Sequence, residues 1–177
     1  REALWKERVA KSPTANCGPP PPLSKKERKA ANLQRLRHHF EGQEADCVPL
    51  FMVDFEAAIT GSDYSLPTEV CIAQYTLRTG FVGEPYHTFI YPGKIPPSLV
   101  NVAKKVTVQL PTGIPFANFS LADTDHTAIW RKIRALVPVD ALLVAKAAKT
   151  ERDCLAWLAL RAGEEQPYTV FEYEDLL

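Results

Sequence analysis

Apolar residues follow two different spacings along this chain, and the change between them divides it into elements. A continuous apolar run at residues 49–55, and segments rich in Val, Ile, Tyr and Thr at 69–78 and 86–91, predict three strands. The turn cluster at 60–63, together with Gly80 and Gly83, indicates short connections between them. Short connections favour an antiparallel meander, because parallel strands need a long crossover.

A helical spacing takes over in the second half. Asp123 or Thr124 is expected to cap one helix, and Thr150 to cap another that ends at Gly163. Their apolar faces are Ile129, Trp130, Ile133 and Leu136 in the first helix, and Leu155, Leu158 and Ala159 in the second. Strands are predicted at 142–145 and 168–171, and a short helix at 98–105. The resulting order, β-β-β-α-β-α-β, predicts an α/β protein with an RNase H-like mixed sheet and flanking helices.

The first 46 residues have a different character. Residues 1–11 predict a short helix, and the Pro-rich run at 18–22 predicts an extended linker. A basic helix is expected at 24–40, where Ser24 and Glu27 have the spacing of a capping box. This helix either docks on the body or lies along a phosphate backbone. Its candidate nucleic-acid contacts are Lys25, Lys26, Arg28, Lys29, Arg35 and Arg37.

Charge supports the same division. The 177 residues are 46% hydrophobic and 24% charged, with a net charge of zero, which argues against a disordered or wholly polybasic chain. Residues 1–46 carry ten Lys or Arg and six Asp or Glu, whereas 47–177 carry eleven and fifteen. We therefore expect a basic arm at 1–46 and a domain at 47–177, and the asymmetry points to a polyanionic partner. The chain starts without Met, so we expect a fragment.

Composition also bears on membranes and redox state. No stretch approaches the 18 consecutive apolar residues of a membrane span. The four cysteines, at 17, 47, 71 and 154, include no CxxC spacing, which indicates a reduced intracellular protein with free thiols.

Asp54-Phe55-Glu56 is the sharpest chemical signal. In a strand, residues i and i+2 point to the same face, so the two carboxylates would stand side by side. Two hard oxygen ligands suit Mg²⁺ or Mn²⁺ and make Asp54 and Glu56 the catalytic candidates. The alternative interpretation is a strand end that faces solvent. His87 is interpreted as a satisfied core or surface histidine. The aromatic residues Tyr75, Tyr86, Phe89 and Tyr91 either stack bases or lie under the helices.

The body resembles the DEDD-type 3′–5′ exonucleases at residues 53–56, 67–70 and 87–92. The resemblance is incomplete. Those enzymes carry a His-Asn and a metal-binding Asp after the fourth strand, where this chain reads Val-Ala-Lys-Ala-Ala-Lys-Thr-Glu at 144–151. A Lys there would repel a second metal. Their final Asp and catalytic His lie on a helix after the last strand, beyond Leu177.

A closer resemblance is to the Maelstrom domain, an exonuclease relative of the germline piRNA pathway. It rests on residues 66–77, 80–81, 86–96, 114–119 and 170–177. Family members carry an HMG box upstream, of which residues 1–11 would be the last turn. Most are thought to hold a structural zinc with Glu, Cys, His and Cys. Only the Glu can be carried over, as Glu69, and the other ligands would lie past Leu177. The alternative for Glu69 is a carboxylate near a strand start, held by backbone.

The resemblance implies a function for the domain. It would bind single-stranded RNA, with weak endoribonuclease activity, alongside piRNA-pathway proteins in transposon silencing, meiosis and gametogenesis. Its expected location is perinuclear germ granules (nuage) and the nucleus, without membrane attachment. Two alternatives stay open: a metal-dependent DEDD-type 3′–5′ exonuclease that uses Asp54 and Glu56, and a protein-interaction scaffold on a nuclease fold. The sequence leaves the enzymatic assignment undecided.

Overall fold

The computed structural model describes residues 24–62, 64–109 and 113–175. The helix expected at 1–11, the Pro-rich run and Cys17 lie outside the described residues. The helices and strands in chain order are α2 (Lys25–Phe40), β1 (Leu50–Thr60), β2 (Ser65–Thr76), β3 (Gly80–Phe89), α3 (Val100–Gln109), α4 (His126–Leu136), β4 (Leu142–Ala145), α5 (Ala148–Ala162) and β5 (Val170–Glu172). Two short 3-10 turns cover Pro97–Leu99 and Tyr173–Asp175.

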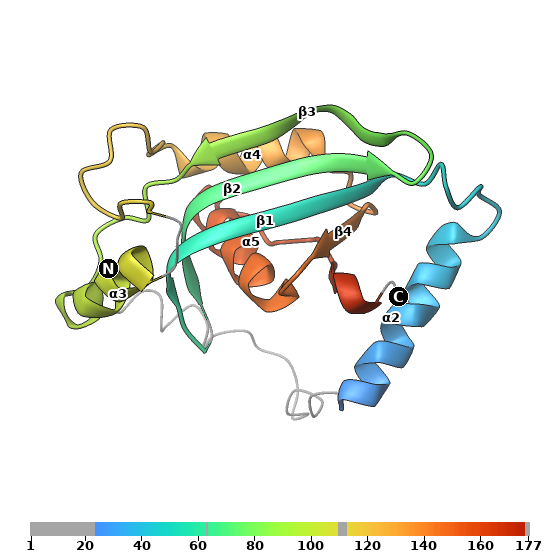
Figure 1. The fold of residues 1–177 in the computed structure, drawn as a ribbon, viewed down its shortest axis with the longest axis horizontal. Coiled ribbons are helices and arrows are strands. Elements are labelled where there is room, and N and C mark those ends of the chain that lie inside the picture. The colour runs from blue at the N-terminus through green and yellow to red at the C-terminus, as the bar shows by residue number, and fades with distance from the viewer. Residues whose placement is uncertain (1–23, 63, 110–112, 176–177) are drawn as a thin grey trace.

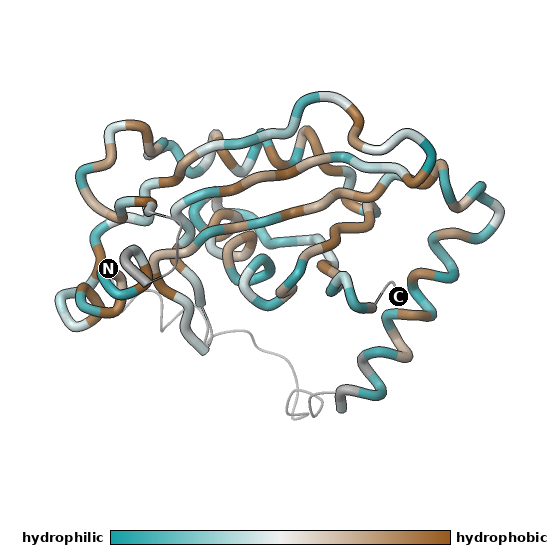
Figure 2. The backbone as a smooth tube through the Cα atoms, in the orientation of Figure 1, coloured by the Kyte–Doolittle hydropathy of each residue, from teal (hydrophilic) through white to brown (hydrophobic). Residues whose placement is uncertain are grey.

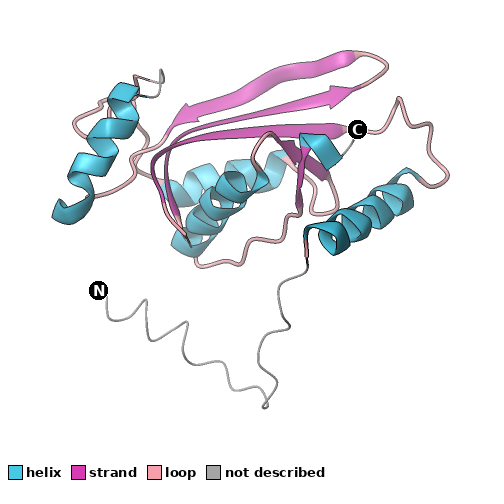
Figure 3. Cartoon of the chain, turned by 60° about the horizontal axis from the view of Figure 1, so that its bottom comes forward, coloured by secondary structure: helices cyan, strands magenta, loops and turns pink. Residues whose placement is uncertain are grey.

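The strands form one mixed sheet in the order β3-β2-β1-β4-β5 (Figure 1). β1 pairs antiparallel with β2, and β2 with β3, as the short connections predict. β4 runs parallel to β1, and β5 runs parallel to β4. Helices α4 and α5 cover one face of the sheet (Figure 3). The predicted α/β mixed-sheet architecture is confirmed.

The hairpin of β1 and β2 is longer than the sequence predicts. β1 continues five residues past Phe55, and β2 begins at Ser65 rather than at Glu69. The extension is stabilised by a second set of apolar contacts, because Ala58 and Ile59 pack with Ile95 and with Ala103 of α3. Gly80 and Gly83, expected in a connection, lie inside β3 with positive φ angles.

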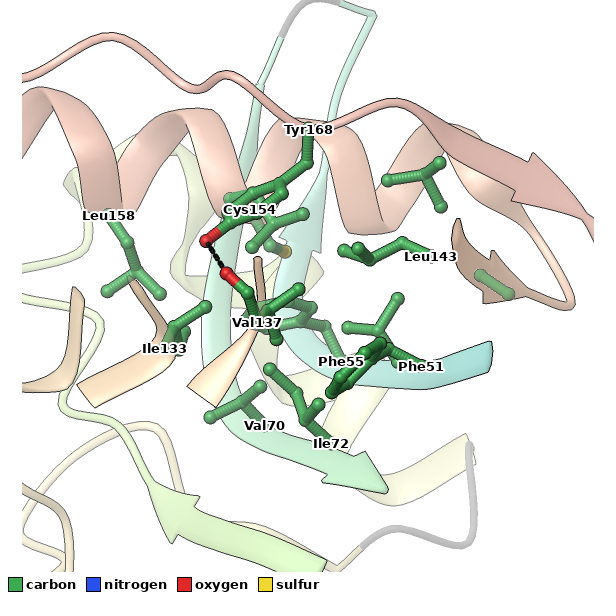
Figure 4. Packing of buried hydrophobic residues seen from close by; sticks show 14 of the residues in the cluster. Phe51, Phe55, Val70, Ile72, Ile133, Val137, Leu143, Cys154, Leu158 and Tyr168 are labelled. Atoms are coloured by element: carbon green, nitrogen blue, oxygen red, sulfur yellow. Dashed lines mark hydrogen bonds between the residues drawn. The ribbon is translucent and has the colours of Figure 1, made fainter. Parts of the chain in front are cut away.

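The core lies between the sheet and the two covering helices. β1 and β2 contribute Phe51, Phe55, Val70 and Ile72, which meet Ile133 of α4 and Leu158 of α5 (Figure 4). Trp130 is fully buried in the same cluster, and its Nε1 donates a 2.8 Å hydrogen bond to Glu164 Oε2. This burial supplies most of the driving force for folding, since stabilisation scales with apolar area removed from water.

The helix starts differ from the sequence prediction in two places. Asp125, rather than the expected Asp123 or Thr124, caps α4 by accepting from the Ala128 N–H at 2.9 Å. Thr150 is not the cap of α5, because the helix already begins at Ala148. The helix ends as predicted, with Gly163 in the left-handed conformation that glycine adopts without steric cost.

Helix α2 forms at the predicted residues and docks on the body. Ser24 and Glu27 make the expected capping box. Leu36 is buried, and Phe40 packs with it against Val48, Leu142 and Phe171. The hydropathy colouring shows apolar positions of this helix among hydrophilic ones (Figure 2). Within the described residues, no helix has the length and apolar character needed to cross a membrane.

A buried hydrogen bond gives a direct test of this packing. The Tyr168 hydroxyl donates to the Val137 carbonyl oxygen at 2.9 Å inside the core (Figure 4). Tyr168→Phe leaves that carbonyl unsatisfied, so we expect a loss of about 1–2 kcal/mol in the free energy of unfolding. Urea unfolding of both proteins measures the loss. Tyr173→Phe is the matched control, because Tyr173 is 53% exposed and should change stability by less than about 0.5 kcal/mol.

Candidate functional site

Asp54 and Glu56 lie on the sheet face that points away from α4 and α5, which we call the outer face. Along β1 the buried residues Phe51, Val53 and Phe55 alternate with exposed Asp54 and half-buried Glu56. This alternation confirms that the two carboxylates share one face, as the i, i+2 spacing predicts. Their catalytic role stays a prediction.

Strand register brings further side chains beside this pair. Asp54 is opposite Cys71 of β2, and Cys71 is opposite His87 of β3. In the next row, Glu56 is opposite Glu69. Directly opposite residues of paired strands point to the same face. The outer face therefore carries five polar or sulfur-bearing side chains, Asp54, Glu56, Glu69, Cys71 and His87, which we call the carboxylate patch.

The patch concentrates negative charge. Burial raises the pKa of Glu56, and the nearby Asp54 and Glu69 carboxylates raise it further. Burial also raises the pKa of the Cys71 thiol, again with added effects from Asp54 and Glu69. Among the described residues, neither Asp54 nor Glu56 forms an ion pair with a Lys or Arg. The patch therefore favours protons or cations.

Glu69 has a side-chain partner. It lies inside β2 rather than near the strand start, and its Oε1 is 2.5 Å from His87 Nε2. The His87 ring also meets Phe89 edge-on, with ring centroids 5.1 Å apart. The expectation that backbone holds Glu69 is thus replaced by a Glu–His pair across two strands. His87 is half-exposed, so it is a surface rather than a core histidine.

The structure adds Glu151, which sequence reasoning passed over. It lies in the first turn of α5, is only 4% exposed, and its Oε2 has no hydrogen-bond partner. Burial raises its pKa to about 7, and Asp54 adds to this effect. The backbone N–H of Phe55 acts in the opposite direction. Glu151 thus approaches the carboxylate patch from the edge of β1, six residues after the end of β4. The signal in the sequence is a Glu at the end of the 144–151 stretch; Lys146, in contrast, is exposed.

Carboxylate oxygens are suitable ligands for a hard divalent cation. Asp54, Glu56 and Glu151 offer the donors that Mg²⁺ and Mn²⁺ prefer. Zinc accepts Glu, His and thiolate, which Glu69, His87 and Cys71 could offer, but the raised pKa of Cys71 opposes the thiolate form. In the described part of the chain, neither trio brings its ligand atoms within 4.8 Å of one another. The donor types fit a divalent cation, and zinc at Glu69 stays a prediction.

One group of potential ligands does meet that distance. Glu44, Asp46 and Cys47, in the segment before β1, lie within 4.8 Å of one another. Arg78 already occupies both carboxylates, with contacts of 2.7 Å to Glu44 and 2.9 Å to Asp46. This guanidinium holds the pKa of Asp46 below its ordinary value. We interpret the group as a clasp that ties the segment to the β2–β3 turn.

The basic helix presents several of its predicted contacts to solvent. Lys26, Lys29, Arg35 and Arg37 are exposed on α2. The side chains of Lys25 and Arg28 lie outside what the structure describes. Leu36 and Phe40 face the body, so the docked interpretation of the helix is confirmed, while nucleic-acid contact stays a prediction.

An apolar groove of about 710 Å³ separates α2 from the outer face. Its lining includes Leu33, Arg37 and Phe40 of α2, Met52 and Tyr75 of the sheet, and Leu77, Phe81 and Tyr173. Of the four aromatic candidates, Tyr75 lines this groove and meets Phe81 edge-on at 5.5 Å. Tyr86 packs against the core under the helices. Phe89 lies on the outer face beside His87, and Tyr91 lines a separate hollow.

The fold of this chain is similar to that of solved exonuclease I structures. Product-bound exonuclease I has a TM-score of 0.57 at 12% sequence identity, and covers 73% of this chain and 30% of its own. The metal-free complex of E. coli exonuclease I with single-stranded DNA has a TM-score of 0.57 at 13% sequence identity, and the match covers 73% of this chain and 29% of that one. At this identity the likeness establishes the fold alone, and it confirms the RNase H-like, exonuclease-related architecture.

Sequence comparison identifies the family. The protein maelstrom homolog of Xenopus tropicalis is 30% identical over 118 residues, which are 63% of this chain and 28% of that protein. The chain thus spans under a third of this curated relative. The sequence model of the family described as "Maelstrom: piRNA pathway germ-plasm component" matches residues 58–177. This chain belongs to the Maelstrom family.

Proposed function

We propose that this domain binds single-stranded RNA in the piRNA pathway and supports transposon silencing in germ cells. The observation that carries the proposal is a nuclease-like fold in a member of a family described as a piRNA-pathway component. The proposed location is perinuclear germ granules and the nucleus, with piRNA-pathway proteins as partners.

Binding is placed ahead of cleavage for a structural reason. The described residues of the outer face do not gather three metal-ligand atoms into one site. Weak endoribonuclease activity, as the family resemblance implies, is therefore the secondary part of the proposal. The exposed Lys and Arg side chains of α2 supply long-range attraction for a phosphate backbone. The body, which has a net negative charge, lacks this attraction.

Glu151 favours a second candidate function, a metal-dependent 3′–5′ exonuclease. Glu151 is a buried carboxyl with one unpartnered oxygen, and its charge interacts with that of Asp54, which makes it a third oxygen donor in the region of the two catalytic candidates. A bound Mg²⁺ or Mn²⁺ would supply Lewis-acid activation of a phosphate ester and of water. The apolar groove favours a third candidate, an interaction scaffold, because contiguous apolar surface typically marks a protein contact.

The first two candidates differ in how they depend on carboxylates and metal. We expect Asp54→Ala/Glu56→Ala to bind 5′-labelled single-stranded RNA with an affinity within about threefold of wild type, since removing negative charge does not weaken phosphate contacts. Any cleavage should be the same with Mg²⁺, Mn²⁺ or EDTA. Gel shift and denaturing gels measure both. Asp140→Ala/Glu165→Ala, which removes equal charge at exposed positions away from the patch, is the control.

A ladder from the 3′ end that both EDTA and the patch variant abolish would contradict the first proposal and support the exonuclease. Absence of both RNA binding and RNA cleavage would leave the interaction scaffold as the remaining candidate function.

Glu151 also predicts a pH dependence of stability. Its pKa is raised from 4.5 to about 7 in the folded protein, so the folded state binds its proton more tightly than the unfolded state. The resulting stabilisation is complete below about pH 4.5 and is lost as pH rises to about 7, a change of about 2–3 kcal/mol. We expect Glu151→Gln to remove this slope in urea unfolding between those pH values. A slope equal to that of wild type would show that Glu151 titrates normally.

A further inference from the structure

A second hollow lies at the far end of α5 from Glu151. It has a volume of about 360 Å³ and lies between the β1–β2 hairpin, the segment after β3, and α5. Its lining includes Tyr64, Lys94, Trp157 and Arg161. The charged members, Lys94 and Arg161, are both cations, although residues 47–177 carry a net charge of −4. We call this hollow the Arg161 pocket.

Arg161 is held in place by ring stacking. Its guanidinium carbon lies 3.9 Å from the centroid of the Trp157 ring. The Trp157 ring meets His126 edge-on at 4.8 Å, and His126 Nε2 is 2.7 Å from the Tyr91 carbonyl oxygen. The chain of contacts runs from backbone through two rings to the guanidinium. A planar guanidinium on an aromatic face keeps its N–H edge available for an anion.

The two cations have no acidic partner in the described part of the chain. None of the ion pairs formed there includes Lys94 or Arg161. Partial burial lowers the pKa of Arg161, and no carboxylate offsets this effect. Both side chains are exposed, so an anion from solvent can reach them without displacing a carboxylate of the described residues. The pocket therefore favours an anionic ligand.

The pocket also offers a surface for a base. Tyr64, at the tip of the hairpin, and Trp157 place aromatic rings in the same lining as the cations. Proteins recognise single-stranded RNA by phosphate contacts from Arg and Lys together with stacking of bases on aromatic side chains. The combination suits a nucleotide better than an isolated inorganic anion, which needs no ring.

We propose that the Arg161 pocket binds a backbone phosphate of single-stranded RNA, with Arg161 and Lys94 contacting the phosphate and Tyr64 stacking on an adjacent base. This inference rests on the proposed RNA-binding function. Glu151 and Arg161 are ten residues apart on α5, or about 15 Å along the helix axis. The pocket is thus a separate contact for the strand, beyond the carboxylate patch.

The test is a salt-dependent binding measurement. Fluorescence anisotropy of labelled single-stranded oligouridine is recorded over a NaCl series for wild type, Arg161→Gln and Lys94→Gln. Each variant should lose affinity by about fivefold, and the slope of log affinity against log salt should fall by about 0.7, the value for one phosphate contact on a single strand. Arg161→Lys should keep the slope and lose part of the affinity, since it keeps the charge but not the fork.

Arg131→Gln and Lys132→Gln on α4 are charge-matched controls at exposed positions outside the pocket, and both should retain the wild-type slope. Thermal melting checks that Arg161→Gln folds. Lys94 is exposed, so its variant tests the pocket even if Arg161→Gln is unstable.

Four results would overturn the inference. If wild type binds RNA and both pocket variants bind it equally well, the pocket is not a contact and the proposed function stands. If the control variants lose as much affinity for the RNA as the pocket variants do, net charge alone explains binding. If a phosphoserine peptide binds wild type but not Arg161→Gln, and leaves the bound RNA in place, the pocket belongs to a phosphoprotein. Failure of wild type to bind RNA at all would reject the proposed function, and the inference with it.

Discussion

The short pairing of β1 with β4 determines where acidic side chains can come together in this fold. β4 pairs with β1 only from Leu50 to Met52, whereas β1 continues to Thr60 along β2. Beyond Met52, the edge of β1 that faces β4 has no strand partner among the described residues. Along this stretch of β1, Glu151 in the first turn of α5 interacts with the Phe55 backbone N–H and with the charge of Asp54.

The sheet could be predicted from the sequence because its strands differ in spacing and composition from its helices. The apolar run at 49–55 and the Val/Ile-rich segment at 69–78 are visible without any tertiary information. The ends of the strands could not be predicted. Ala58 and Ile59 extend β1 where they pack with Ile95 and Ala103, which lie 36 to 45 residues further along the chain. The prediction for the start of α5 is also wrong, because Thr150 has the chemistry of a cap but lies within a helix that starts at Ala148.

The candidate site shows the same division. Asp54 and Glu56 share a face by strand geometry alone, so the sequence is enough to predict that they lie side by side. His87 is eighteen residues from Glu69, and their contact depends on the register of β2 with β3. The position of Glu151 depends in addition on the residue at which β4 ends. Contacts that depend on strand register, or on where an element ends, cannot be recognised from neighbouring residues in the sequence. The contact between residues two apart on one strand can.

The groove between α2 and the outer face affects how this domain behaves at high concentration. Phe81 is 66% exposed and Leu77 is 64% exposed, and both lie beside Met52 and Leu33. Two copies of the chain can bury these side chains against each other, and with a net charge of zero there is little repulsion to oppose them. Colloidal stability near neutral pH is therefore limited by the same surface that offers a partner its apolar contact. Solution conditions that move the net charge away from zero favour the monomer.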